Sequence, residues 1–200
     1  EYFGKPTVTK SGIVKKVYGN IGKAEDAQNV VQNGGEGIGL FRTEFLFMDR
    51  EHQPTEDEQF EAYSTVAKAM DNKEVIIRTL DIGGDKAIDY LSIEKEDNPF
   101  LGYRAIRYCL GNKELYKTQL RAILRAAQFG NIKIMLPLVT TVDEVKQAKA
   151  LIKECCDELE NEGLRYRNVP VGVMIETPSA AIISDLLAKE VDFFSIGTND

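Results

Sequence analysis

Short apolar runs rich in β-branched residues alternate along the chain with longer stretches of helical periodicity. The apolar runs, each of which predicts a strand, cover residues 14–21, 37–41, 74–80, 132–139, 171–176 and 192–197. Strands that alternate with helices predict a parallel sheet, because each crossover returns the chain to the same end of the sheet. The runs are apolar nearly throughout, which is typical of strands that are covered on both faces.

Several of the intervening stretches open with helix-start signals. Thr55 with Glu58 and Thr141 with Glu144 each fit a capping box, in which the two residues reciprocally satisfy free backbone N–H groups. Thr177 precedes a proline, which is tolerated at the first position of a helix. We therefore expect helices to begin at these three threonines.

The arrangement favours a (β/α)8 barrel of the TIM type within the α/β class. No GxGxxG motif follows the first strand, so a dinucleotide-binding fold is disfavoured. Polar side chains instead gather where several strands end, as they do at the active-site face of a barrel. A full barrel has eight strands, and the sequence supplies about six of them. We expect an upstream connection over 1–12 and a barrel domain over 13–200, truncated at its C-terminal end.

Composition and charge exclude several classes of protein. The net charge is −7 with acids and bases interspersed, which disfavours a nucleic-acid partner or an anionic membrane surface. No apolar run approaches the roughly 20 residues that span a bilayer, and the first residues lack the apolar core of a secretory signal. Cys109, Cys155 and Cys156 show no metal-binding or disulfide pattern, so we expect them to pack in helices of a cytoplasmic protein.

Three arginines are predicted to face the mouth of the barrel. Arg42 and Arg78 follow or close two consecutive strands, and Arg104 comes shortly after the segment NPFLGY. Guanidinium groups bind phosphate and carboxylate oxygens in a bidentate manner, and three of them would repel one another unless an anion joined them. Internal salt bridges of Arg42 with Glu44 and of Arg78 with Asp81 are the alternative, and position alone does not decide between the two.

Two carboxylates end the last two predicted strands. Glu176 and Asp200 are placed to share one divalent cation, and Mg²⁺ usually takes one or two carboxylates together with substrate phosphate oxygens and water. The alternative is that one of these acids neutralises a neighbouring arginine. Asn199 offers an amide to a ligand oxygen, although an Asn–Asp pair is also ordinary turn chemistry.

No other residue adds evident chemistry. The single histidine, His52, lies in a charged loop with nothing nearby to orient it, so we interpret it as exposed. Arg107, Arg121 and Arg125 fall in helical stretches and are expected to be solvated. The residues thus predict a binding and metal site without a proton shuttle.

Seven sequence blocks, in order, resemble the phosphoenolpyruvate-binding domain of Enzyme I, the phosphoenolpyruvate–protein phosphotransferase family of the bacterial sugar phosphotransferase system. They are GGEGIGLFRTEFLFMDR (34–50), PTEDEQFEAY (54–63), RTLDIGGDK (78–86), NPFLGYRAIR (98–107), IMLPLV (134–139), VMIETPSA (173–180) and DFFSIGTND (192–200). The blocks cover nearly all of the chain. Pyruvate phosphate dikinase and phosphoenolpyruvate synthase are relatives with the same barrel.

The resemblance implies a reaction and a set of ligands. Phosphoenolpyruvate would bind with Mg²⁺, and its phosphoryl group would pass to a histidine on another domain and then to the phosphocarrier protein HPr, for sugar uptake. The family also implies a cytoplasmic homodimer formed through the barrel. The residues that would bind phosphoenolpyruvate are Arg42, Arg78, Arg104 and Asn199. The residues that would bind Mg²⁺ are Glu176 and Asp200.

Departures from the family pattern limit what is transferred. His52 does not occupy the motif of the phosphorylated histidine, and none of the three cysteines matches the family's enolate-protonating cysteine, so no catalytic residue is assigned. We expect the chain alone to be inactive. The alternatives are a dikinase, which typically has a histidine shortly after RTE, or a synthase. A non-catalytic dimerisation module and an unrelated metal-dependent lyase or aldolase barrel are the others.

Overall fold

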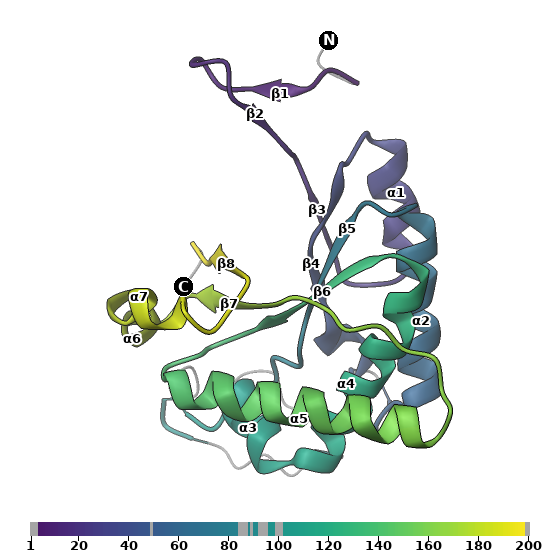
Figure 1. The fold of residues 1–200 in the computed structure, drawn as a ribbon, viewed down its shortest axis with the longest axis vertical. Helices are drawn as coiled ribbons and strands as arrows, with labels where there is room; N and C mark the ends of the chain where they lie inside the picture. The colour runs from purple at the N-terminus through teal and green to yellow at the C-terminus, as the bar shows by residue number, and fades with distance from the viewer. Residues whose placement is uncertain are drawn as a thin grey trace.

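Six parallel strands form one curled sheet, in which their spatial order is their order along the chain (Figure 1). The computed structural model describes residues 4–48, 50–83, 88, 90–91, 96–98 and 102–198. The strands are β3 (Gly19–Ile21), β4 (Gly37–Arg42), β5 (Glu74–Arg78), β6 (Asn131–Leu136), β7 (Val171–Ile175) and β8 (Phe193–Ile196). Each overlaps one predicted run, so the predicted α/β class and six-stranded partial barrel are confirmed.

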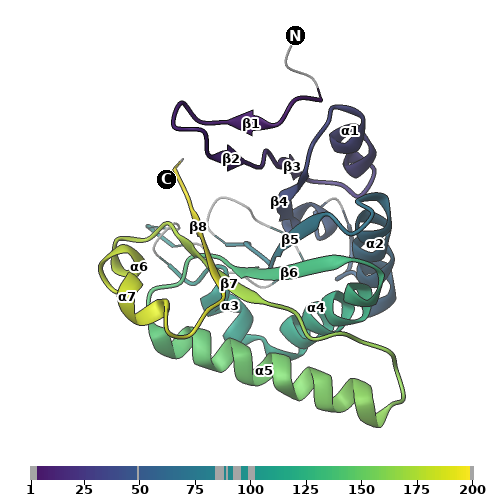
Figure 2. The same ribbon diagram turned by 45° about the horizontal axis from the view of Figure 1, so that its top comes forward.

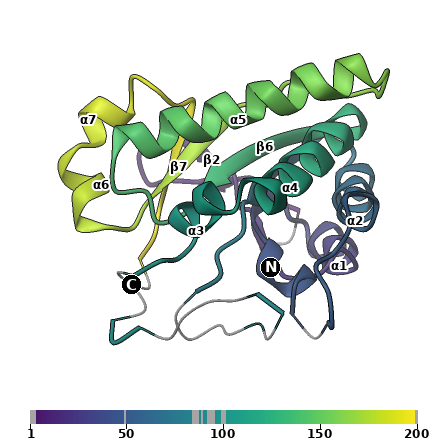
Figure 3. The ribbon, with the colours of Figure 1, turned by 90° about the horizontal axis from the view of Figure 1, so that it is seen from below.

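Helices cover one face of the curled sheet, and the other face lies inside the curve (Figures 2 and 3). The longer helices of that outer layer are α1 (Asp26–Gln32), α2 (Glu56–Ala69), α4 (Lys113–Ala126) and α5 (Val142–Asn161). Shorter helical segments connect the elements: η1 (Thr43–Leu46), α3 (Ile106–Gly111), η3 (Ala127–Phe129), α6 (Pro178–Ile182) and α7 (Ser184–Leu187). No described helix is both long enough and apolar enough to cross a membrane.

The two faces of the sheet carry separate apolar clusters. The larger cluster fills the space between the strands and the helices. The smaller one takes one side chain from each of five consecutive strands, β4 to β8, namely Leu40, Ile76, Met135, Met174 and Phe193. Apolar side chains on the inner face of the curled sheet agree with the filled interior of a small barrel.

The prediction of a single strand over 14–21 is wrong. β2 (Val14–Lys15) instead pairs antiparallel with β1 (Thr7–Val8), and only β3 joins the main sheet. This two-stranded ribbon extends away from the sheet in Figure 1, and all four of its residues are exposed. Lys15 and Lys16 explain the difference, because consecutive charged side chains cannot both be buried in a strand that is covered on both faces. The domain boundary placed at residue 13 stays a prediction.

The predicted helix starts are confirmed. The Thr55 hydroxyl accepts a hydrogen bond from the Glu58 backbone N–H at 3.2 Å, and the Thr55 N–H donates to the Glu58 carboxylate at 2.7 Å. Thr141 and Glu144 form the same box at the start of α5, with distances of 3.2 and 2.9 Å. Thr177 accepts from the N–H of Ala180 at 3.1 Å.

The expectation that the helical arginines are solvated is wrong for α4. Arg121 and Arg125 both bind the Glu56 carboxylate of α2 at 2.6 Å, and Arg121 also binds Glu162, beyond the end of α5, at 2.6 Å. Their side chains are 12% and 17% exposed. Arg107 is half-buried. Because α4 lies between α2 and α5, its arginines pair with acidic residues on both sides and are largely shielded from solvent (Figure 2).

The capping carboxylate of α2 predicts a pH effect on stability. The Thr55 N–H and then Arg50 lower the pKa of Glu58 from 4.5 to about 2. A lowered folded-state pKa stabilises the fold above the unfolded pKa, and this contribution is lost as the pH falls from 4.5 toward 2. Glu58→Gln should therefore destabilise the protein by about 0.5 kcal/mol near pH 7, the range for exposed charge pairs.

Urea unfolding of both proteins between pH 7 and pH 3 measures this difference. The difference between the wild type and the variant should shrink as the pH falls. A difference that is constant over that range would show that the charge of Glu58 does not stabilise the cap.

Candidate functional site

Four charged side chains form a buried cluster where β4 and β5 end. Arg78 donates to Glu44 Oε1 at 2.7 Å and to Asp81 Oδ2 at 3.1 Å. Arg104 binds the same Asp81 through Nε at 2.9 Å and through a terminal nitrogen at 3.3 Å. None of the four residues is more than 7% exposed. We call Glu44, Arg78, Asp81 and Arg104 the strand-end cluster.

Strand register explains the position of this cluster. Arg42 and Arg78 are paired residues on the neighbouring strands β4 and β5, so the predicted equivalence of their positions is confirmed. The chain continues from Arg42 directly into η1, which carries Glu44 to the guanidinium of Arg78. The alternative with two salt bridges is therefore present only in part. Arg78 binds Asp81 as that alternative supposed, but it also binds Glu44, while Arg42 lies 4.8 Å from the ring centre of Phe45.

A close backbone approach holds Arg104 against the end of β5. Gly83 has φ +137°, and a Cβ added there would lie 2.7 Å from the Cβ of Arg104. The N–H of Ala105, whose φ is +51°, donates to the Ile82 carbonyl at 3.1 Å. Only glycine adopts the conformation at position 83 without strain, and only glycine leaves space for Arg104. The first glycine of the block RTLDIGGDK thus has a packing reason, while Gly84 lies outside the described residues.

Glu176 follows β7 and is oriented by the loop after β6. Its Oε1 accepts from the backbone N–H of Leu138 at 2.7 Å, and Leu138 adopts the left-handed region with φ +50°. Gly197, after β8, packs so closely that an added Cβ would lie 2.8 Å from the Cβ of Glu176. The half-buried carboxylate therefore has a fixed position at the carboxyl edge of the sheet. Asn199 and Asp200 lie outside the described residues, so their roles stay predictions.

The electrostatics of the mouth suit an anion. Within the strand-end cluster two guanidinium groups balance two carboxylates, and Arg42 adds a further positive charge beside them. The Nε atoms of Arg42 and Arg78 are buried and make no hydrogen bond within the described part of the chain. Leaving a buried charged donor unsatisfied costs free energy, and an anionic oxygen would satisfy it. The carboxylates fix the guanidinium plane of Arg78, and the Nε donors of Arg42 and Arg78 are the ones that such an oxygen would satisfy.

The other titratable groups are poor candidates for chemistry. His52 is exposed, as expected. Cys109, Cys155 and Cys156 are buried, and desolvation raises their pKa values, that of Cys155 to about 12. A thiol with such a pKa is not a nucleophile at neutral pH. Among the described residues, no group of three or more His, Cys, Asp or Glu side chains is arranged to hold a metal ion.

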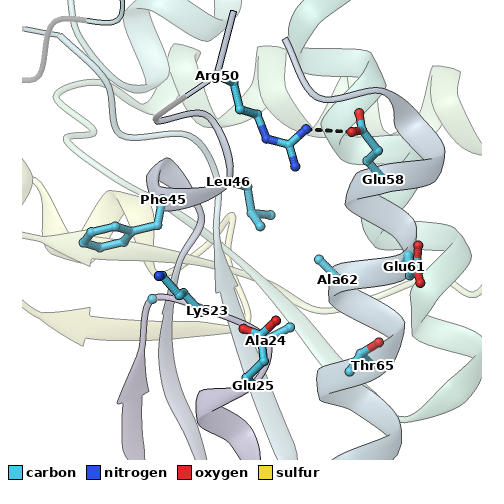
Figure 4. Close-up of a pocket in the computed structure, with 11 residues that line it drawn as sticks. Lys23, Ala24, Glu25, Phe45, Leu46, Arg50, Glu58, Glu61, Ala62 and Thr65 are labelled. Atoms are coloured by element: carbon cyan, nitrogen blue, oxygen red, sulfur yellow. Dashed lines mark hydrogen bonds and ion pairs between the residues drawn. The ribbon is translucent and has the colours of Figure 1, made fainter. Parts of the chain in front are cut away.

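A cavity of about 500 Å³ lies beside η1 and is distinct from the strand-end cluster (Figure 4). Arg50 pairs with Glu58 at one end of it, at 2.6 Å. None of the three site arginines lines the cavity, and its lining mixes both signs of charge without a convergent set of donors. Its lining residues are Gly22, Lys23, Ala24, Glu25, Phe45, Leu46, Arg50, Glu58, Glu61, Ala62 and Thr65.

Sequence reasoning missed the polar residues behind the cluster. Thr43 and Gln119 are fully buried and hydrogen-bonded to each other at 3.1 Å, next to the ends of β4 and β5. A signal for Gln119 was present. It lies on the apolar stripe of α4 with Tyr116, Leu120 and Ile123, and a polar residue on a buried helical stripe requires polar partners.

The fold and the site together define a class: an α/β barrel of the TIM type whose mouth carries arginines held by carboxylates. Residues 2–200 match the family described as PEP-utilising enzyme, PEP-binding domain. The chain belongs to this family of phosphoenolpyruvate-utilising enzymes.

Individual relatives agree with this assignment. The chain is 55% identical over 197 residues to a phosphoenolpyruvate-protein phosphotransferase of Bacillus subtilis, covering 98% of the chain and 35% of the relative. It is 58% identical over 182 residues to that of Priestia megaterium, covering 90% and 32%. It is 52% identical over 195 residues to that of Staphylococcus aureus, covering 97% and 34%. The chain thus spans about a third of the length of these relatives.

The contact between Gly83 and Arg104 predicts the effect of a substitution. Gly83→Ala should destabilise the protein by about 2 kcal/mol or more, because the new Cβ would meet Arg104 and the backbone would be strained. Gly163→Ala is the matched control, since Gly163 also has a positive φ, +70°, but nothing lies within 4 Å of an added Cβ. Its cost should be only about 1 kcal/mol. Equal costs in urea unfolding would contradict the close approach at Gly83.

Proposed function

We propose that the chain is the phosphoenolpyruvate-binding domain of an Enzyme I-type phosphoenolpyruvate–protein phosphotransferase. The observation that carries the proposal is the pairing of Arg42 and Arg78 at one level of the sheet, each with a buried Nε donor that makes no hydrogen bond in the described part of the chain. These two side chains would bind the phosphate, and Arg104, held by Asp81, would lie beside it. Asn199 would contact the rest of the substrate.

Mg²⁺ is the proposed cofactor, with Glu176 and Asp200 as its protein ligands. The Leu138 N–H fixes one oxygen of Glu176, which orients the carboxylate as a ligand would require. Magnesium usually binds one or two carboxylates together with substrate phosphate oxygens and water, so this donor set fits. When bound, the cation would neutralise phosphate charge next to the arginines.

The chemistry asked of this chain is positioning and charge neutralisation. Phosphoryl transfer needs little covalent work from the protein, because preorganised cations stabilise the charged oxygens in the transition state. The phosphoryl group would pass to a histidine outside this chain, since His52 is exposed and has no described partner that orients it. HPr would be the next acceptor, for sugar uptake, and the protein would be a cytoplasmic homodimer that neither inserts into membranes nor binds nucleic acid.

The comparisons favour this proposal over the alternatives. The relatives reported above are all named phosphoenolpyruvate-protein phosphotransferase, at 52–58% identity, and none is named a dikinase or synthase. A non-catalytic dimerisation module is disfavoured by the strand-end cluster. Burying four charges costs several kcal/mol per ion before they pair, and a scaffold gains no stability from this that apolar side chains would not supply.

Substitution of Arg78 tests the phosphate site. Arg78→Lys should raise the Kd for phosphoenolpyruvate at least about 30-fold, or about 2 kcal/mol, because an ammonium group cannot replace a planar guanidinium held by Glu44 and Asp81. Calorimetric titration with saturating Mg²⁺, on the protein at its natural length, measures this. Arg125→Lys, the same change on the outer face of α4, should bind as the wild type does. Unchanged affinity in the Arg78 variant would refute the site.

Substitution of Glu176 tests the metal ligand. Glu176→Gln should raise the Mg²⁺ concentration needed for half-maximal phosphoenolpyruvate binding at least about 10-fold, because the amide keeps the bond from Leu138 but loses the charge. Glu144→Gln is the control, since its carboxylate also accepts backbone hydrogen bonds nearby but caps α5. If both variants keep the wild-type Mg²⁺ dependence, Glu176 is not a ligand.

A further inference from the structure

A fully buried glutamine on α4 reaches through the helical layer to the ends of β4 and β5. Gln119 Oε1 accepts from the backbone N–H of Leu80 at 2.9 Å, and its Nε2 donates to the Thr43 hydroxyl at 3.1 Å and to the Tyr63 hydroxyl at 3.2 Å. Gln119, Thr43 and Tyr63 are all 0% exposed. The Gln119 side chain therefore binds a neighbour of Glu44, after β4, and a neighbour of Asp81, after β5.

The directions of these hydrogen bonds follow from the chemistry of the groups. The Leu80 N–H can only donate, so the atom facing it must be the amide oxygen of Gln119. The amide nitrogen then donates both of its hydrogens, to Thr43 and to Tyr63. Their hydroxyl hydrogens go onward, from Thr43 to the Arg78 carbonyl at 2.8 Å and from Tyr63 to Gln59 at 3.1 Å. Every polar group of the Gln119 amide thus has a partner.

The two residues at the strand ends that Gln119 contacts, Thr43 and Leu80, each lie between site residues in the sequence. Thr43 lies between Arg42 and Glu44, and its hydroxyl binds the carbonyl of Arg78, so it joins the end of β4 to the end of β5. Leu80 lies between Arg78 and Asp81, next to the carboxylate that holds Arg104. Removing the amide of Gln119 would leave the Leu80 N–H unsatisfied and would remove one of the two hydrogen bonds that hold the Thr43 hydroxyl.

We propose that Gln119 is a positioning residue for the phosphate site: through Thr43 and Leu80 it fixes the backbone that presents Arg42, Arg78 and Asp81. Gln119 does not touch the substrate. This inference rests on the proposed function only in the choice of phosphoenolpyruvate as the ligand whose Kd is measured. The geometry that carries it, a satisfied amide between two strand ends, is independent of the identity of the ligand.

The chain supplies a matched control for this role. Gln59 is also a buried glutamine, 0% exposed, in the same hydrogen-bonded network, but its partners are Tyr63 and the Pro54 carbonyl, and neither of these residues adjoins the strand-end cluster in the sequence. Gln119→Met and Gln59→Met both replace an amide by an apolar side chain of similar size. Both should lower the melting temperature, since each leaves buried polar groups unsatisfied.

Only Gln119→Met should weaken binding. In calorimetric titrations of the protein at its natural length with Mg²⁺, its Kd for phosphoenolpyruvate should rise at least about 10-fold, or about 1.4 kcal/mol, and that of Gln59→Met less than about 2-fold. Thr43→Val tests the route. If Gln119 acts through Thr43, the Kd of the double variant Gln119→Met/Thr43→Val should rise by less than the product of the fold-changes of the two single variants. Equal Kd values for the two methionine variants would overturn the inference.

A measurement without ligand separates this inference from the proposed function. The Nε–H signal of Arg78 in an NMR spectrum, assigned by its loss in Arg78→Lys, should shift in Gln119→Met and stay in place in Gln59→Met. If the wild type binds no phosphoenolpyruvate, the proposed function fails and the Arg78 signal alone decides the positioning role. An Arg78 signal that is unchanged in Gln119→Met overturns that role, whatever the wild type binds.

Discussion

The buried ion pairs of Arg78 with Glu44 and Asp81 are the constraint around which the mouth of this barrel is organised. The guanidinium of Arg78, a residue that is 7% exposed, must have its charge balanced nearby, because breaking a buried pair costs about 3–5 kcal/mol. That requirement fixes η1 immediately after β4, where it brings Glu44 to the guanidinium. It also fixes the turn after β5, where Asp81 binds both Arg78 and Arg104.

The helical layer completes this arrangement from outside. α4 packs between α2 and α5 through ion pairs of its arginines, and the same helix sends Gln119 inward to the strand ends. A change in the packing of α4 would therefore be felt at Thr43 and Leu80, although the helix contributes none of the charged site residues. The outer layer in this way supports the geometry of the mouth.

Much of the fold could be predicted because its signals are local. The apolar runs and the threonine caps placed six strands and three helix starts, since periodicity and capping act within a few residues. The prediction of one strand over 14–21 was wrong because the apolar residues of this run were given more weight than Lys15 and Lys16. The strand that pairs with β2, β1, is only two residues long and gave no signal of its own. The prediction that the arginines of α4 are solvated was wrong for another reason: their partners on α2 and α5 are distant in sequence.

The site shows the same division between local and distant information. Arg42, Arg78 and Glu176 could be found because each stands where an apolar run stops, which in a parallel sheet places it at one edge. Which carboxylate binds which arginine depends on η1 and on the approach of Gly83 to Arg104, and neither follows from spacing along the chain. Gln119 gave a signal, a polar residue on the apolar stripe of α4, but its partners at Thr43, Tyr63 and Leu80 are distant in sequence and could not be named from it. A polar residue on the apolar stripe of a helix therefore indicates that buried polar partners must lie opposite it, although only the fold shows which residues these are.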